Sequence, residues 1–142
     1  MEYIQTTKKF VAVLNKKISV GNLMNALGHS TAGLVALYPE VSEMRFNNYI
    51  DKNNGIHQSI SDNPFIILSV DNSNKIRTLR NELIAKNIPC VDFTGSMTVG
   101  TYAEQQEQTL RTAEIDLEYY CIVFFGEISE LNELTRKFSL WK

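Results

Sequence analysis

The chain alternates short apolar segments with longer segments in which polar residues dominate. The apolar segments are continuous rather than alternating, which is typical of β-strands that are covered on both faces. Four such strands are predicted, at residues 10–14, 65–70, 88–93 and 119–125. Strands of this kind need helices above and below the sheet to exclude water.

Helical spacing fills the segments between these strands. Apolar residues between 20 and 37 share one arc of a helical wheel, and Pro39 ends that helix. Ser73 suits the N-cap of a second helix, and Asn87 suits its end. Thr101 opens a capping-box pattern and a polar run to residue 118, which predicts an exposed helix or a mobile lid. Residues 127–137 predict a further short helix.

The order of strands and helices predicts one α/β domain over residues 1–142, with a parallel sheet and right-handed crossovers. No repeat, Gly/Ser linker or block of like charge marks a domain boundary. Ligands of such folds bind at the carboxyl ends of the strands. We therefore expect the functional residues within 15–22, 71–73 and 92–100.

The first of these segments is a candidate anion site. Lys16 and Lys17 add positive charge just before a helix start, where backbone N–H groups and the helix dipole favour an anion. Gly21 would let a phosphate approach the backbone closely. The alternative interpretation is a solvated basic turn that holds no ligand.

A polar stripe follows on the first helix. Asn22, Asn25 and His29 are spaced i, i+3 and i+7, so they share one face, opposite the apolar arc. The stripe either faces a cleft, with His29 as an acid, base or hydrogen-bond donor, or is the solvated side of an amphipathic helix.

Asp92 is a carboxylate inside an apolar strand, so it must reach the strand end or find partners. It acts either as a general base or orienting group at a cleft, or as a cap of the turn that follows. Thr94, Ser96 and Thr101 come soon after it and offer hydroxyl contacts to a ligand.

Composition and charge narrow the function classes. The chain has 142 residues, 44% of them hydrophobic and 21% charged, which excludes intrinsic disorder. The net charge of −2 is unlike that of a general nucleic-acid coat protein. No segment approaches the roughly 20 apolar residues of a membrane span, and the N-terminus lacks a signal pattern. We expect a cytoplasmic protein without a membrane partner.

The cysteines and histidines indicate neither a metal site nor a cofactor. Cys90 and Cys121 lie in apolar runs, which favours buried reduced thiols over a disulfide or redox role. They show no metal-ligand spacing with His29 and His57, and His57 lies in a polar stretch that predicts a surface position. The chain contains no nucleotide-binding motif, so we expect no metal and no cofactor.

Two segments carry a resemblance to a known family. Residues 9–14 followed by Gly21-Asn22-Leu23-Met24-Asn25-Ala26-Leu27-Gly28-His29 resemble the opening of type II peptidyl-tRNA hydrolases. Residues 89–96, which include Asp92-Phe93-Thr94-Gly95-Ser96, resemble the strand of that family that ends in Asp-Ala-Gly-x-Thr.

The chain is still more similar to a bacterial family of unknown function, domain of unknown function 2000. Members of that family share a Gly-x-x-x-Asn-x-x-x-His pattern like Gly21, Asn25 and His29, and an Asp-Phe-Thr segment. Their C-termini look like Phe125-Gly126 and residues 138–142, so the resemblance spans nearly the whole chain.

The resemblance implies a mixed, mainly parallel four-stranded sheet with helices on both faces. It also implies a candidate catalytic set, because the lysine, aspartate and threonine of the hydrolases fall on Asn22, Asp92 and Ser96. Asn22 can donate a hydrogen bond but lacks the fixed cation that binds phosphate or stabilises an oxyanion. The glutamine of the same hydrolase helix falls on Ala26.

Three interpretations follow. In the first, the protein hydrolyses an acyl ester or amide of an RNA or a small metabolite, with catalytic and substrate-binding roles at Asp92, Asn22, His29, Ser96 and at Lys16, Lys17, Gly21, Asn25, Thr94, Thr101. In the second, the same cleft binds a small anion or a partner without catalysis. In the third, the protein forms a homodimer through an apolar surface at Phe138, Leu140 and Trp141.

Overall fold

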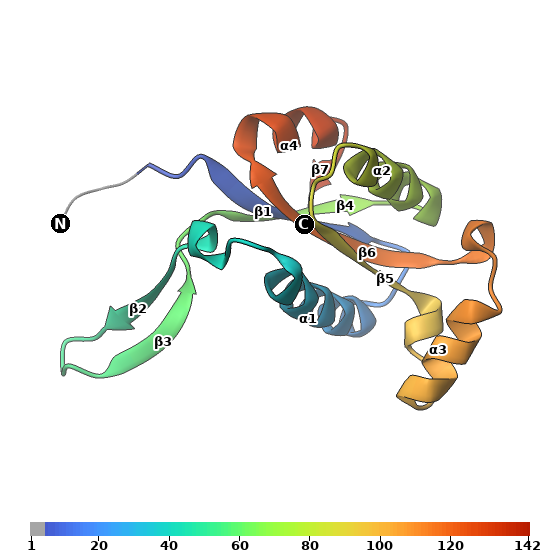
Figure 1. The fold of residues 1–142 in the computed structure, drawn as a ribbon, viewed down its shortest axis with the longest axis horizontal. Coiled ribbons are helices and arrows are strands. Elements are labelled where there is room, and N and C mark those ends of the chain that lie inside the picture. The colour runs from blue at the N-terminus through green and yellow to red at the C-terminus, as the bar shows by residue number, and fades with distance from the viewer. Residues whose placement is uncertain (1–4) are drawn as a thin grey trace.

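A computed structural model describes residues 5–142 as a twisted five-stranded sheet between helices, with a separate two-stranded arm (Figure 1). The strand order in the sheet is β5-β6-β1-β4-β7. The bounds of these strands are β1 Lys8–Asn15, β4 Phe65–Val70, β5 Cys90–Thr94, β6 Tyr119–Glu127 and β7 Ser139–Leu140. Residues 1–4 belong to the N-terminal segment in which no signal pattern is expected, and they lie outside the described residues.

Helices cover both faces of the sheet, as predicted. Helix α1 lies on one face, and α2 and α4 lie on the other (Figure 1). The helices are α1 Val20–Leu37, α2 Ser73–Ala85, α3 Tyr102–Leu110 and α4 Ile128–Thr135, with 3-10 turns η1 Val41–Met44, η2 Gly95–Met97 and η3 Glu114–Asp116.

The continuous apolar runs reflect burial on both sides. Along β6, Ile122 and Phe124 enter the core beneath α2, whereas Cys121 and Val123 enter the core beneath α1, and all four are fully buried. Successive strand residues point to opposite faces, so a strand covered on both sides needs an apolar residue at each position. The two cores therefore meet at the central strands.

The sheet is mixed, but the prediction that its strands pair mainly in parallel is wrong. Only β1 and β4 pair in parallel, with Val11 opposite Ile66, while β6 is antiparallel to both β1 and β5. The segment that contains α3 leaves the carboxyl end of β5 and returns to the same edge of the sheet, so β6 runs back. An apolar run indicates that a strand is buried but not which way the strand runs. The sequence pattern therefore could not reveal that β6 is antiparallel to its neighbours.

The structure adds a fifth strand and a hairpin to the four predicted strands. Strand β7 pairs with β4 for only two residues, too short a length to show any periodicity. Strands β2 (Phe46–Ile50) and β3 (Ile56–Ser61) form the hairpin, which projects from the body as an arm (Figure 1). His57 lies on this arm, exposed as predicted, with its Nε2 2.8 Å from Asp51 Oδ2.

Helix ends follow local capping chemistry. Helix α1 has the predicted bounds, and Asn87 adopts the left-handed conformation (φ 56°) expected after a helix end. The cap of α2 is Asn72, whose side chain accepts from the Lys75 N–H at 2.9 Å, rather than Ser73. Helix α3 ends at Leu110, well before the polar run ends at residue 118. Thr112 and Ala113 then lead into η3.

The prediction that Phe138, Leu140 and Trp141 form one exposed apolar patch is wrong. Phe138 is half-buried against the core beneath α2, and Trp141 is half-buried against the core beneath α1. Leu140 alone stays well exposed, at 58%. Both cysteines are free, and burial raises the pKa of Cys121 to about 11, as expected for an unreactive thiol.

Candidate binding groove

The carboxyl ends of β1, β4 and β5 meet the start of β6 at one edge of the sheet. Asn15 Nδ2 donates to the Tyr119 carbonyl at 3.1 Å, and the Lys16 N–H donates to the Val70 carbonyl at 2.8 Å. The Gly95 N–H donates to the Glu118 carbonyl at 2.9 Å. These bonds fix the three segments that the sequence singled out at a common edge.

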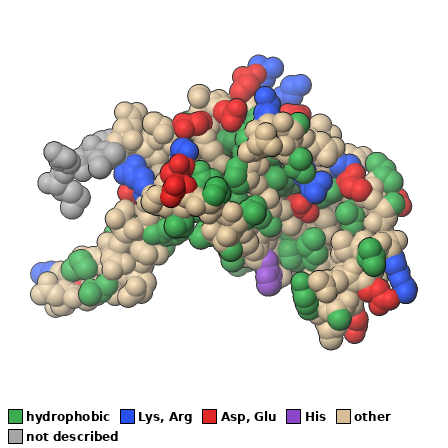
Figure 2. Space-filling model, in the orientation of Figure 1, with side chains coloured by type: hydrophobic (Ala, Val, Ile, Leu, Met, Phe, Trp, Pro, Cys, Tyr) green, Lys and Arg blue, Asp and Glu red, His purple; other side chains and the backbone are tan. Residues whose placement is uncertain are grey.

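A groove of about 950 Å³ opens beside this edge, between α1 and α3, with β5 as its floor. It corresponds to the notch in Figure 2 between the central body and the lower-right lobe, which is α3 in Figure 1. The residues that line the groove are Asn22, Asn25, His29 and Ser30 of α1, Val91, Asp92, Phe93, Met97 and Thr98 along β5 and η2, and Tyr102, Gln105, Gln106, Thr109 and Leu110 of α3.

The polar stripe of α1 forms one wall. Leu23, Ala26 and Leu34 turn the opposite side of the helix into the core, so Asn22, Asn25 and His29 are exposed on the groove side. The His29 ring stacks on Phe93, with centroids 6.1 Å apart and planes at 26°. The wall therefore presents two amides and an imidazole that is held against an aromatic ring.

Helix α3 forms the facing wall and buries none of its own residues. Its groove side carries Tyr102, Gln105, Gln106, Thr109 and Leu110, at the spacing i, i+3, i+4, i+7 and i+8 of one helix face. The predicted Thr101 cap is present, because its hydroxyl accepts from the Glu104 N–H at 3.3 Å. Thr101 itself lies outside the groove lining and serves the helix.

A chain of hydroxyl groups ties α3 to the end of β5. Thr109 donates to the carbonyl of Gln105 at 2.8 Å, so it accepts from Ser96 at 2.7 Å, and Ser96 in turn accepts from Thr94 at 2.8 Å. Thr94 is fully buried and Ser96 nearly so. Thr94 and Ser96 each donate their hydroxyl proton to the next hydroxyl group in this series. The two residues therefore help to dock α3.

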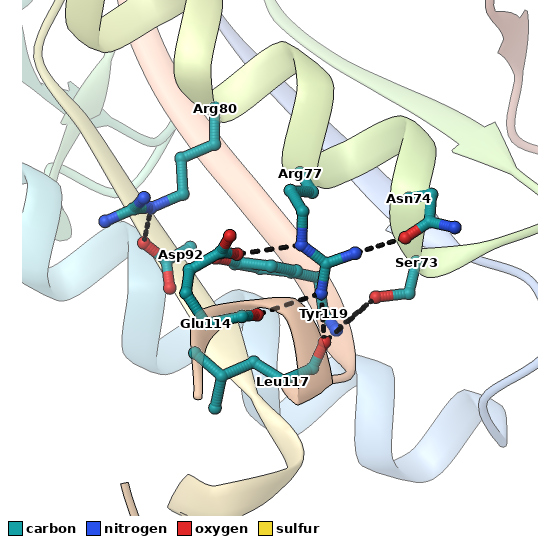
Figure 3. A network of polar contacts seen from close by, with 8 residues as sticks. All are labelled: Ser73, Asn74, Arg77, Arg80, Asp92, Glu114, Leu117 and Tyr119. Atoms are coloured by element: carbon teal, nitrogen blue, oxygen red, sulfur yellow. Dashed lines mark hydrogen bonds and ion pairs between the residues drawn. The ribbon is translucent and has the colours of Figure 1, made fainter. Parts of the chain in front are cut away.

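Asp92 reaches the groove, but its carboxylate points away from the polar stripe. Val91 and Phe93 pack on the α1 side of β5, so Asp92 directs its side chain to the α2 side. There Arg80 Nε donates to Asp92 Oδ1 at 2.9 Å (Figure 3). Within residues 5–142, no hydrogen bond joins the carboxylate to Asn22, His29 or Ser96, so the predicted catalytic set does not assemble.

Beside this ion pair, a buried arginine holds the segment that follows α3 (Figure 3). Arg77 Nε donates to the Glu114 carboxylate at 2.8 Å, and Nη2 donates to the carbonyls of Glu114 and Leu117 at 3.1 and 2.6 Å. Its guanidinium lies 5.1 Å from the centroid of the Tyr119 ring. Arg77 therefore fixes the connection from which α3 projects.

Two pKa values report this packing. The hydrogen bond from Arg77, followed by the one from the Tyr119 hydroxyl, holds the pKa of Glu114 below its ordinary value. Burial, with the hydrogen bond to Glu114 as a second cause, raises the pKa of Tyr119 to about 12. The network therefore stays in one charge state, with an ionised Glu114 and a neutral Tyr119, across the neutral pH range.

The expected anion-binding residues lie outside the groove. The Nζ of Lys16 sits 5.6 Å from the centroid of the Trp141 ring, and the backbone N–H of Lys17 donates to Asn15 Oδ1 at 3.0 Å. Gly21 is exposed, and a Cβ there would meet nothing within 4 Å. The two lysines belong to a solvated turn beside the C-terminus.

Sequence reasoning predicted a helix or lid after Thr101, but it missed the residues of α3 that line the groove and the aromatic floor. Once the capping box fixes the start of the helix, helical spacing places residues 102, 105, 106, 109 and 110 on one face. Its mixture of Tyr, Gln, Thr and Leu, however, gives no apolar stripe to mark a packed face. Phe93 is 7% exposed, and its ring stacks on that of His29.

Two features are absent from the part of the chain that the structure describes. Residues 5–142 contain no cluster of three or more His, Cys, Asp or Glu side chains that could hold a metal ion. Across the same residues, every helix is too short or too polar to traverse a lipid bilayer.

Comparison with known proteins places the chain in a family. It matches no curated protein. Among solved structures it resembles the protein of unknown function Atu0240 from Agrobacterium tumefaciens strain C58, with a TM-score of 0.82 at 14% identity over 97% of this chain and 100% of that one. At this identity the likeness shows the fold alone. The family described as "Protein of unknown function (DUF2000)" matches residues 8–142, and the chain therefore belongs to the DUF2000 family.

Proposed function

We propose that the protein is a non-catalytic binding protein whose α1–α3 groove holds an uncharged ligand rich in amide groups, such as a segment of polypeptide. The observation that carries this proposal is the chemistry of the lining. Four primary amides, of Asn22, Asn25, Gln105 and Gln106, project from the two walls. A primary amide donates and accepts hydrogen bonds at once, which matches the pairing needs of a peptide group.

The charge of the groove supports an uncharged ligand over the small anion expected from the sequence. Among the described lining residues there is no lysine or arginine. The one carboxylate, that of Asp92, is paired with Arg80 on the far face of β5. An anion would lose water in this groove without gaining a cationic partner, and such an exchange is unfavourable.

The positions of the reactive groups support binding over hydrolysis. A general base must lie within hydrogen-bond reach of the proton that it takes, and a nucleophile needs such a base beside it. Ser96 donates to Thr109, and Asp92 accepts from Arg80. Hydrolysis of an acyl ester or amide with Asp92 as the base would require a rearrangement that frees this carboxylate from Arg80.

The test is an NMR titration of the ¹⁵N-labelled protein with pooled capped pentapeptides that contain no charged residue. We expect shifts of the side-chain amides of Asn22, Asn25, Gln105 and Gln106. We also expect roughly tenfold weaker binding for Gln105→Ala, the loss of about one hydrogen bond. Gln108→Ala is the matched control, because Gln108 lies on the same helix outside the groove lining, and its affinity should stay within about twofold.

Two results would overturn the proposal. One is a peptide pool that leaves the groove amides unshifted, or inorganic phosphate that shifts them. The other is hydrolysis of an N-blocked aminoacyl-tRNA that the wild type performs and Asp92→Asn does not. The second result would restore the hydrolase interpretation, in which the carboxylate is the working group.

A further inference from the structure

We propose that the ligand binds as an added β-strand, an extended polypeptide segment that pairs with the open edge of β5. This inference rests on the binding function proposed for the groove. It specifies the conformation of the ligand and the backbone groups that recognise it.

The edge of β5 is the first observation. β5 is the outermost strand on its side of the sheet and pairs through Cys90–Thr94 with β6 alone. Within residues 5–142, no backbone hydrogen bond joins Val91, Asp92 or Phe93 to any element other than β6. Alternate residues of such a strand point an N–H and a C=O away from the sheet, which is a template for another strand.

The groove meets this edge at its three central residues. Val91, Asp92 and Phe93 all belong to the lining, and α1 and α3 stand on either side. A strand of five residues is roughly 17 Å long, which matches the length of β5. Strand addition would supply regular backbone bonds, and the wall amides would meet the peptide groups left on its outer side.

The two faces of β5 predict the side-chain pattern of the ligand. An added strand would place every second side chain beside Phe93 and His29, and the others beside Asp92 and Arg80. The first set meets an aromatic surface and the second meets an ion pair. The groove therefore fits a segment in which apolar and polar residues alternate.

Charge around the groove favours basic residues outside the paired stretch. Between residues 101 and 118 the chain carries five carboxylates and one arginine, Arg111. The carboxylates are Glu104, Glu107, Glu114, Asp116 and Glu118. Glu107 is paired with Arg111 and Glu114 with Arg77, and the other three carboxylates would steer a peptide with flanking lysines towards the groove. The occupant is thus a segment whose paired stretch is uncharged, with alternating apolar and polar residues, and whose flanks are basic.

The test uses the capped peptide Lys-Val-Thr-Val-Thr-Val-Lys and versions with a single backbone N-methyl group at each internal position. An N-methyl group removes one donor, so strand pairing predicts an alternating pattern in the peptide series. Methylation at one set of alternate positions should weaken binding roughly tenfold, and at the other set less than about twofold. The outward amides of β5 should also gain protection from hydrogen exchange.

Other outcomes would overturn strand addition, and they separate it from the proposed function. If the peptide shifts the groove amides but the N-methyl series does not alternate, side chains alone bind it and the binding function stands. If neither this peptide nor the uncharged pool shifts them, both proposals fail. If the β5 amides become protected with rising protein concentration alone, a second copy of the chain occupies the edge.

Discussion

The Glu114 carboxylate links the charge of Arg77 to the packing of the segment between α3 and β6. It accepts from Arg77 and Tyr119 at 2.8 Å each, and these bonds hold the segment between α3 and β6 against α2. Arg77 is 8% exposed, so losing its anionic partner would leave a nearly buried cation with only neutral acceptors. The ionised state of this single carboxylate therefore supports the base of α3.

The substitution Glu114→Gln tests this through pH. The folded state lowers the pKa of Glu114, so its stabilising effect is present above the ordinary value near 4.5 and is lost as pH falls through the folded-state pKa. We expect the urea midpoint of the wild type to fall between pH 6 and pH 3, and that of Glu114→Gln to be lower at pH 6 and to fall less. Asp116→Asn in the same turn is the control and should keep the wild-type slope. An unchanged slope in Glu114→Gln would contradict the role.

Helix α3 shows how an element with no buried residue is held in place. Its attachments are the Thr109–Ser96 bond at one side and the segment that Arg77 fixes at its end. Such an element opens locally at a lower free energy than the core does. The groove wall is therefore docked by a few polar bonds and not by apolar burial.

Thr109→Val measures that docking. Valine keeps the shape of threonine and removes the hydroxyl, so we expect faster hydrogen exchange across residues 102–110, with the local opening free energy lowered by about 1 kcal/mol. Thr112→Val is the matched control, because Thr112 makes the same bond to the carbonyl four residues back but contacts no other element through its hydroxyl. Equal exchange in the two variants would show that the bond to Ser96 does not dock α3.

At the scale of elements, the sequence predicts most of what is buried and little of what projects. The four apolar runs became β1, β4, β5 and β6 because burial on both faces demands apolar residues throughout. The hairpin was missed although Asn54-Gly55 is a strong turn signal, and Asn54 adopts the positive φ of 64° that such turns need. Its strands bury no apolar face, so no run marks them.

The whole molecule is a covered sheet with an arm at one end and the groove lobe at the other (Figure 1). Every residue of β2 is exposed, and the arm carries exposed aromatic and aliphatic side chains at Phe46, Tyr49, Ile50, Ile56 and Ile60. Its root is fixed by the Arg45–Asp62 ion pair at 2.9 Å. The arm therefore adds surface to the molecule without adding to its core.

Replacing residues 47–60 by Asn-Gly should leave the core intact. Phe46 and Ser61 face each other across the hairpin, so a two-residue turn can join them. We expect the free energy of unfolding in urea to change by less than about 1 kcal/mol, since the removed apolar groups are exposed in both states. Met44→Ala, at a fully buried residue beside the root, is the comparison and should cost about 2–4 kcal/mol. A comparable loss from the deletion would mean that the arm packs on the body.

At this scale the sequence could predict the layers but not the assembly of the site. Asn22, Asn25 and His29 share one wall because helix periodicity is a local property. Whether Asp92 faces them depends on which side of β5 packs on α1, and that is decided by the tertiary fold. The same holds for strand direction, which depends on where the chain re-enters the sheet after α3.

The absence of buried residues in α3 also affects how this wall can change during evolution. Core residues are constrained by volume, and most substitutions there cost stability. The side chains of α3 on the groove side are free of that constraint, apart from Thr109. Mutations can therefore accumulate along this helix while the sheet persists, and chains that share the fold can come to differ in the side chains of this wall.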